Sequence, residues 1–239
     1  MEYEKSAPWY DKIYSFKDYA AEAARLRSLV EQHRPGSRRL LDVACGTGEH
    51  LRHLRQHFDV VGIDASQAML EVAHRKLPGV PLHQGDMRTF DLGATFDAAI
   101  CMFGATGHLG DEGELLAALQ QIARHLVPGG VLIVEPWLTP EVFVPGRLSG
   151  LFVDEPELKI SRMSVGWRQD RLAILDLHHL IGTPAGVEHF VERLEMTLFP
   201  LDAYRSAMAA VGVSFEFDPE GPMGRGLFVG VLAADQAQT

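Results

Sequence analysis

The sequence predicts an α/β protein with a doubly wound, mostly parallel sheet and an antiparallel β insertion. From residue 39 to residue 136, apolar runs typical of buried strands alternate with helical segments, as in a parallel sheet covered by helices. After Trp137 the pattern changes to longer strand-like segments joined by short polar turns, which favours antiparallel pairing. The first apolar run also ends in a glycine turn, and doubly wound sheets bind their ligands at such strand ends.

Residues 1–38 are predicted to form a lid followed by a helix over 18–32. The lid interpretation depends on four aromatic side chains near the start of the chain: Tyr3, Trp9, Tyr10 and Tyr14.

Residues 39–136 are predicted to be a Rossmann-like core. Its strands are expected at 40–43, 60–63, 81–83, 96–102 and 131–135. Its helices are expected at 49–57, 66–76 and 112–125, with Ser66 as a cap and Pro128-Gly129-Gly130 after the last helix.

Residues 137–199 are predicted to be the antiparallel insertion, which we expect to cover the substrate site. Its strands are expected at 158–165, 171–180 and 188–199. Residues 200–239 are predicted to complete the core sheet with a helix over 201–211 and strands over 214–217 and 226–232, as an antiparallel edge.

The composition narrows the function classes. A formal charge of −10 over 239 residues disfavours nucleic acid or an anionic membrane surface as the main partner. The sequence shows neither a signal-peptide pattern nor a twenty-residue apolar run, and Cys45 and Cys101 lie in apolar segments. We therefore expect a cytoplasmic protein without a membrane partner.

No metal site is predicted. The two cysteines lack the spacing of metal ligands. His50, His53 and His57 have helical spacing directly after the glycine turn, where we expect a solvated helix face rather than a zinc site.

The glycine turn indicates a nucleoside cofactor. Gly46 and Gly48 allow a tight turn whose N–H groups approach a ligand, and the helix expected from Glu49 adds a positive dipole end. The third glycine of the nicotinamide fingerprint is absent, because position 51 is Leu, whereas Asp42 precedes the glycines. The segment Asp42-Val-Ala44-Cys-Gly-Thr-Gly48 resembles motif I of class I S-adenosylmethionine (SAM) methyltransferases.

The ends of the next strands carry further candidates for the cofactor site. Asp64, sixteen residues beyond Gly48, is placed to accept hydrogen bonds from ribose hydroxyls, a feature shared with dinucleotide-binding folds. Asp86-Met87 pairs a carboxylate with an apolar side chain, which suits adenine, although Asp86 also fits a turn cap. Together these blocks favour SAM over nicotinamide. The predicted cofactor residues are Asp42, Ala44, Gly46, Gly48, Asp64, Ala65, Asp86, Met87 and Met102. Cys101 and Phe103, on either side of Met102, fit either the site or ordinary core packing.

Over nearly its whole length the chain resembles the nucleotide-sugar N,N-dimethyltransferases of macrolide deoxyaminosugar pathways, the desosamine and mycaminose enzymes. Residues 17–23, 41–48, 82–88 and 107–109 match, and the most specific blocks are Glu135-Pro136-Trp137 and the glycine-rich segment 221–230. The chain departs from the family pattern in a shorter segment before Asp18-Tyr19 and at Asp64, Leu138 and Met223.

This resemblance implies a homodimer that transfers two methyl groups from SAM, without a metal, to the amine of a dTDP-linked 3-amino-3,6-dideoxyhexose. It implies that Tyr10 and His108 line the substrate cleft and that Arg225 meets the nucleotide phosphates. Tyr19 and Trp137 are candidate contacts to the sugar or the base, and each fits the core equally.

The resemblance thus makes Tyr10 and His108 the candidate catalytic residues, and His108 is in addition a suitable proton acceptor, because a histidine titrates near neutral pH. We favour a positioning role for both, since an amine can arrive already deprotonated. Each of these residues also has a purely structural interpretation. His108 fits a loop histidine with its hydrogen bonds satisfied, and Arg225 fits a surface arginine in a hairpin turn.

Two other functions stay open at this point. One is a small-molecule N- or O-methyltransferase of secondary metabolism with a non-nucleotide acceptor. The other is a SAM-binding regulatory protein without turnover. The sequence also leaves open the position of the amine, at C3 or C4, the number of methyl groups and the nucleotide base.

Overall fold

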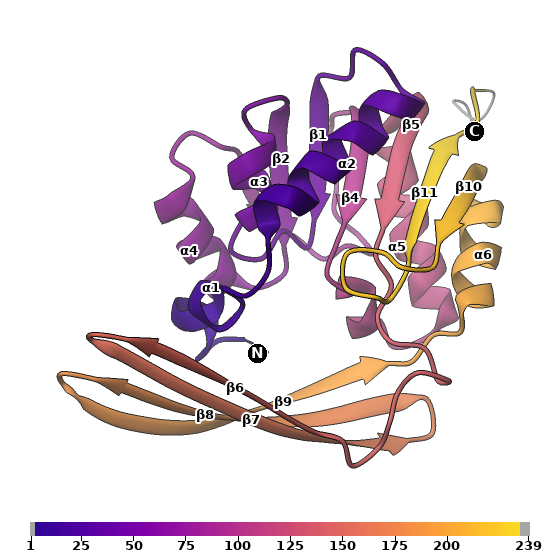
Figure 1. The fold of residues 1–239 in the computed structure, drawn as a ribbon. Helices are drawn as coiled ribbons and strands as arrows, with labels where there is room; N and C mark the ends of the chain where they lie inside the picture. The colour runs from indigo at the N-terminus through magenta and orange to yellow at the C-terminus, as the bar shows by residue number, and fades with distance from the viewer. Residues whose placement is uncertain (1–2, 235–239) are drawn as a thin grey trace.

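The computed structural model describes residues 3–234 and contains two separate β-sheets (Figure 1). The larger sheet has seven strands in the order β10-β11-β5-β4-β1-β2-β3. Its strands are β1 (Arg39–Val43), β2 (Asp59–Asp64), β3 (Leu82–Gln84), β4 (Phe96–Cys101), β5 (Leu126–Val134), β10 (Val213–Asp218) and β11 (Leu227–Leu232). The five neighbouring strands β5, β4, β1, β2 and β3 are parallel to one another. Strand β11 pairs antiparallel with β5, and β10 pairs antiparallel with β11. The predicted doubly wound, mostly parallel sheet with an antiparallel edge is confirmed.

Helices cover both faces of this sheet. They are α2 (Tyr19–His33), α3 (Glu49–Leu54), α4 (Gln67–Lys76), α5 (Glu112–Arg124) and α6 (Leu201–Ala210). Apolar side chains of α2, α3 and α4 form one core layer with the sheet, and those of α5 and α6 form the other. Ser66 caps α4 as predicted, because its Oγ accepts the N–H of Met69. No helix within residues 3–234 combines the length and the hydropathy needed to span a bilayer.

Strand β5 begins earlier than predicted. The segment 128–130, which we expected to follow a helix end, lies inside the strand, and its register against β4 shifts between Phe96 and Ala98. Gly129 has φ +73°, and a Cβ on Gly130 would lie 2.7 Å from the carbonyl oxygen of Val127. The glycines are therefore needed for the irregular start of the strand.

The insertion is a four-stranded antiparallel sheet rather than the three strands predicted. Its strands are β6 (Leu148–Glu155), β7 (Leu158–Gln169), β8 (Leu172–Thr183) and β9 (Gly186–Thr197), and each pairs with the next. Strand β6 was missed because Leu148 and Phe152 are exposed and Gly150 interrupts the run, so the segment lacks the apolar alternation of a half-buried strand.

The N-terminal segment lies between the two sheets (Figure 1). It contains a 3₁₀ turn η1 (Ala7–Trp9) and a short helix α1 (Tyr10–Ile13). Ile13 packs with Ile160, Ile181 and Phe190 of the smaller sheet. On the other side, Asp11 accepts hydrogen bonds from Thr47 Oγ1 (2.5 Å) and Lys76 Nζ (2.6 Å) of the larger domain. We call residues 3–14 the strap, because they join the two halves of the molecule.

Candidate active site

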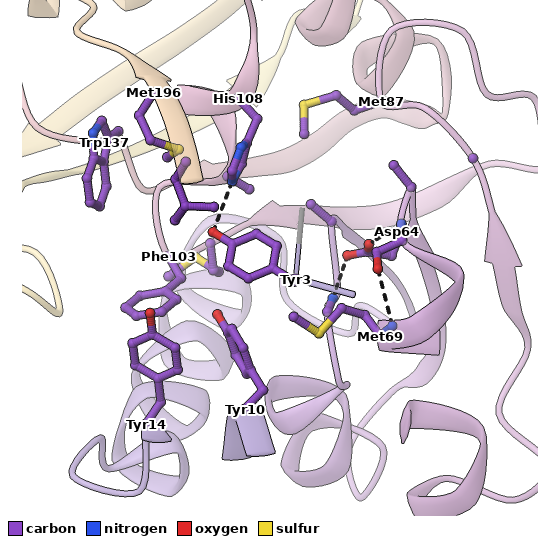
Figure 2. A pocket seen from close by; sticks show the side chains of 18 residues that line it. Tyr3, Tyr10, Tyr14, Asp64, Met69, Met87, Phe103, His108, Trp137 and Met196 are labelled. Atoms are coloured by element: carbon purple, nitrogen blue, oxygen red, sulfur yellow. Dashed lines mark hydrogen bonds between the residues drawn. The ribbon is translucent and has the colours of Figure 1, made fainter. Parts of the chain in front are cut away.

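A cavity of about 530 Å³ opens between the carboxyl ends of the parallel strands and the smaller sheet (Figure 2). Its lining comes from three parts of the chain, namely the strap, the strand ends of the core and strand β9. The lining residues are Tyr3, Tyr10, Tyr14, Ala44, Gly46, Asp64, Ala65, Ser66, Met69, Gly85, Met87, Met102, Phe103, Ala105, His108, Trp137, Leu194 and Met196. Segments far apart in the sequence therefore build one site.

The turn after β1 has the geometry predicted for a cofactor site. Gly46 and Gly48 have φ of +55° and +80°, and Gly48 precedes the first residue of α3. A Cβ on Gly46 would meet no atom within 4 Å, since this residue borders the cavity. The turn is tied to β2, because Asp64 accepts the N–H groups of Gly46 (2.7 Å) and Ser66 (2.8 Å). Two of the predicted cofactor residues thus hold each other in place at the cavity.

Asp42 is a buried carboxylate beneath this turn. Neither of its oxygens has a hydrogen-bond partner among residues 3–234, and burial raises its pKa to about 7. A buried carboxylate without a donor is unfavourable, so a ligand that supplies a cation or an N–H group at this position is stabilised. The predicted cofactor SAM carries ribose hydroxyls and an ammonium group, and the open glycine turn and the two carboxylates, Asp64 at the cavity and Asp42 behind it, fit these groups.

The strap supplies the aromatic wall of the cavity. The Tyr3 hydroxyl lies 3.2 Å from Nε2 of His108, and the Tyr3 ring is edge-on to both His108 and Tyr10. Tyr14 packs edge-on against Phe103 at a centroid distance of 5.0 Å. Burial raises the pKa of Tyr10 far above its usual range, so its hydroxyl stays protonated at neutral pH.

Strand β9 supplies the apolar wall through Leu194 and Met196, which sequence reasoning did not identify. A Cβ on Gly107 would lie 2.7 Å from Cε of Met196 and 2.8 Å from Cβ of Trp137. The smaller sheet therefore packs closely against the core because residue 107 is glycine. The only sequence signal was the alternation within β9, which does not show what the strand faces.

Arg225 is buried at the edge of the cavity rather than exposed in a hairpin turn. Its guanidinium lies between the rings of Phe103 and Trp137, at 5.0 Å and 4.9 Å from their centroids. Its Nε is 3.9 Å from Oε1 of Glu135, and its Nη1 has no hydrogen-bond partner among residues 3–234. Burial raises the pKa of Glu135, and the Arg225 charge opposes that shift.

Five of the predicted site residues lie outside the cavity lining, namely Asp42, Gly48, Asp86, Tyr19 and Arg225. Asp86 forms hydrogen bonds with the guanidinium of Arg88, although its neighbours Gly85 and Met87 line the cavity. Tyr19 packs edge-on against His50, and Lys17 Nζ lies 5.1 Å from its ring centroid. Asp42 is buried within β1, and Gly48 belongs to the glycine turn itself.

The expectation of a solvated histidine face on α3 was wrong for His50. This side chain is buried, and its Nε2 lies 2.9 Å from Oε2 of Glu22 on α2. The charged partner on the neighbouring helix explains its burial. Within the described part of the chain, no group of three or more His, Cys, Asp and Glu residues is arranged to hold a metal ion.

Comparisons with known proteins agree with this geometry. Residues 40–130 match the methyltransferase domain family. The dTDP-3-amino-3,6-dideoxy-alpha-D-glucopyranose N,N-dimethyltransferase of Streptomyces fradiae is 44% identical over 232 residues, which cover 95% of this chain and 91% of that enzyme. The dTDP-4-amino-2,3,4,6-tetradeoxy-D-glucose N,N-dimethyltransferase of Saccharopolyspora spinosa is 39% identical, with coverages of 93% and 90%. The SAM-bound structure of CalS10, an amino pentose methyltransferase from Micromonospora echinaspora, is 41% identical, with a TM-score of 0.86 and coverages of 93% and 95%.

The burial of Asp42 predicts a pH-dependent stability. Its pKa is about 7 in the folded protein and near 4 in the unfolded chain, so between these values the folded protein binds more protons. The free energy of unfolding therefore falls as the pH rises from about 4 to about 7, by up to about 4 kcal/mol from this group. Asp42→Asn should remove this part of the slope.

Urea unfolding at pH 5 and pH 8 measures the effect. Asp59→Asn, at an exposed position at the start of β2, is the matched control. Equal pH slopes for the wild type and Asp42→Asn would contradict the prediction.

Proposed function

This chain belongs to the N,N-dimethyltransferases of dTDP-linked aminodeoxysugars, and we propose that it methylates twice the amine of a dTDP-linked 3-amino-3,6-dideoxyhexose, with SAM as the methyl donor. The observation that carries the proposal is one cavity that joins the cofactor-type strand ends to the aromatic strap and to Phe103 and Trp137, the two rings that enclose the buried Arg225. The identity of 44% to a 3-amino relative and 39% to a 4-amino relative favours an amine at C3.

We propose that the core strand ends bind the cofactor. The Asp64 carboxylate, already fixed by two backbone N–H groups, has lone pairs left to accept bonds from ribose hydroxyls. Asp42 lies behind the cavity lining, so we propose that its carboxylate attracts the ammonium of the methionine moiety without contact, while Met87 and Met102 supply apolar surface for the adenine. Ala44, Gly46 and Ala65 leave room for the ligand because their side chains are small or absent.

Arg225 supports a nucleotide-linked acceptor. Its buried Nη1 lacks a hydrogen-bond partner among residues 3–234, and the two rings beside it, Phe103 and Trp137, line the cavity. A diphosphate at this edge would satisfy the guanidinium with charge-assisted hydrogen bonds. The negative charge of Glu135, 3.9 Å from Nε of Arg225, helps to hold the guanidinium at this position. Trp137, whose Nε1 also lacks a partner in the described chain, then faces the sugar or the base.

The chemistry required of the protein is mainly positioning. When bound, SAM supplies a methyl group on a sulfonium. The amine nitrogen attacks the methyl carbon, a C–N bond forms as the C–S bond breaks with its electrons going to sulfur, and the amine then loses a proton. Holding these atoms in line within a cavity that excludes water accounts for the rate. We propose that Tyr10 and His108 orient the acceptor rather than activate it.

Mass spectrometry of a reaction with purified protein, SAM and dTDP-3-amino-3,6-dideoxyglucose tests the function. We expect two added methyl groups, because the family members dimethylate their substrates. The free aminosugar should be methylated far more slowly, since it cannot use Arg225.

Parallel reactions with the 4-amino sugar nucleotide and with the free aminosugar are the controls. Faster turnover of the 4-amino sugar nucleotide would show that the preferred substrate carries its amine at C4 rather than at C3. Equal turnover with the free sugar would favour the non-nucleotide acceptor, and SAM binding without any methyl product would favour a regulatory protein.

The pH dependence of a His108 variant distinguishes an orienting role of His108 from a role as general base. If it only orients the substrate, His108→Asn keeps measurable turnover, which rises with pH as more of the acceptor amine is deprotonated. We expect a loss of kcat/KM of about 10²-fold or less. His74→Asn, at an exposed position on α4, is the control. Loss of activity at every pH would identify His108 as an obligatory base.

We also propose that the protein is a homodimer formed through the outer face of the smaller sheet. This face exposes Leu148, Phe152, Met163, Leu180 and Val191, which lie on neighbouring strands, and Leu148 is 80% exposed. An apolar face of this extent is unusual on a monomer. A second copy of the chain would bury it against an identical face.

Sedimentation at micromolar concentration tests the dimer. The wild type is expected to sediment as a dimer, and Phe152→Glu as a monomer, because a charge on this apolar face opposes its burial. Val144→Glu, which changes an exposed apolar residue outside the smaller sheet, is the control. A wild-type monomer would refute the proposal.

A cytoplasmic location is part of the same proposal. Cys45 and Cys101 are both buried free thiols, which is typical of proteins in a reducing compartment.

A further inference from the structure

One buried carboxylate outside the proposed site connects the smaller sheet to the strap. Glu192 lies on the inner face of β9, and its Oε1 accepts the backbone N–H groups of Lys5 (3.0 Å) and Ser6 (3.1 Å). These two residues lie between Tyr3 and Tyr10, which both line the cavity. The contact therefore fixes the strap between two of its functional side chains.

The environment of Glu192 makes this contact stronger. The side chain is buried, and its nearest titratable neighbour is His179, whose Nε2 lies 3.8 Å from Oε2. Burial lowers the pKa of His179 to about 4, so the imidazole is uncharged at neutral pH and gives Glu192 no ion pair. The strap N–H groups are then the principal stabilisation of the carboxylate, in charge-assisted hydrogen bonds.

The strap needs such an anchor because its backbone is strained. Tyr3 has φ +62°, in the left-handed region that non-glycine residues rarely adopt. A strained conformation persists only where the surrounding contacts determine it. Tyr3 also makes the contact to His108, so any release of the strap near residue 5 moves the aromatic wall of the cavity.

The cofactor side of the strap has its own anchor. Asp11 is held by Thr47 of the glycine turn and by Lys76 of α4, and neither contact involves Glu192. Loss of the Glu192 contact should therefore loosen residues 3–9 while α1 stays attached to the core.

We propose that Glu192 is a positioning residue that holds Tyr3, against the ring of Tyr10, over the acceptor half of the cavity. It acts through the strap and does not touch the reacting atoms. The kinetic part of this inference rests on the proposed function, whereas the structural part does not.

Hydrogen–deuterium exchange of the strap amides in Glu192→Ala tests the structural part. We expect exchange of residues 4–9 to become about tenfold faster or more, because both N–H groups lose their acceptor. Glu192→Gln keeps an acceptor oxygen and should restore much of the protection. Glu188→Ala, an exposed glutamate on the same strand, is the matched control and should leave exchange unchanged.

Kinetics on the same variants test the positioning role. Glu192→Ala should raise KM for the aminosugar nucleotide about tenfold, while the Kd of SAM changes less than about threefold. Glu192→Gln should fall near the wild type. Unchanged strap exchange in Glu192→Ala, or an equal weakening of SAM and acceptor binding, would overturn the inference. If the natural acceptor proves to be different, the exchange result still decides the structural part.

Ser6→Pro gives an independent route if Glu192→Ala does not fold. It removes one of the two N–H donors without changing the sheet, and Ser6 has φ −85°, close to the value of proline. Faster exchange of the strap in Ser6→Pro would support the inference, and wild-type protection would contradict it.

Discussion

The site depends on one constraint of backbone geometry, which is that the carboxyl ends of parallel strands all lie at the same edge of a sheet. At this edge the chain has to turn away sharply, and it does so through left-handed residues. Ala44 and Phe103 have φ of +59° and +58°, and a glycine with positive φ lies close after each. Among residues 3–234 only four non-glycine residues have positive φ, and three of them, Tyr3, Ala44 and Phe103, line the cavity. Backbone strain is thus concentrated where a ligand would bind.

The same constraint explains which parts of the site the sequence predicted. Gly46, Asp64, Met87 and Met102 were identified because each lies at or just after the end of a predicted strand, and parallel topology brings all such ends together. This inference needs only the local pattern of each strand and one rule of topology. The exact side-chain directions are a separate matter. Asp86, for example, lies outside the cavity lining. Its carboxylate instead forms a charge-assisted hydrogen bond with the guanidinium of Arg88, two residues later, which lowers the pKa of Asp86.

The remaining parts of the site depend on how the second sheet and the strap pack, which no local pattern records. Leu194 and Met196 alternate like any half-buried strand, and their role appears only when Gly107 lets β9 approach. Arg225 was predicted from a specific glycine-rich block. Its burial between two rings additionally requires Gly104, where a Cβ would lie 2.8 Å from Nη1. Such contacts join segments more than eighty residues apart.

The placement of charge in the structure suits a methyl transfer from a sulfonium to an amine. In that reaction a single positive charge moves from sulfur to nitrogen and is shared between them on the way, so no new charge develops that the protein must stabilise. A cavity wall of aromatic and apolar side chains is therefore compatible with the chemistry, and it excludes competing water. The strong charges of Arg225, Glu135 and Lys17 lie behind Phe103 and Trp137 rather than at the centre. The alignment of the reacting atoms therefore depends on how precisely the strap and the two sheets are held together.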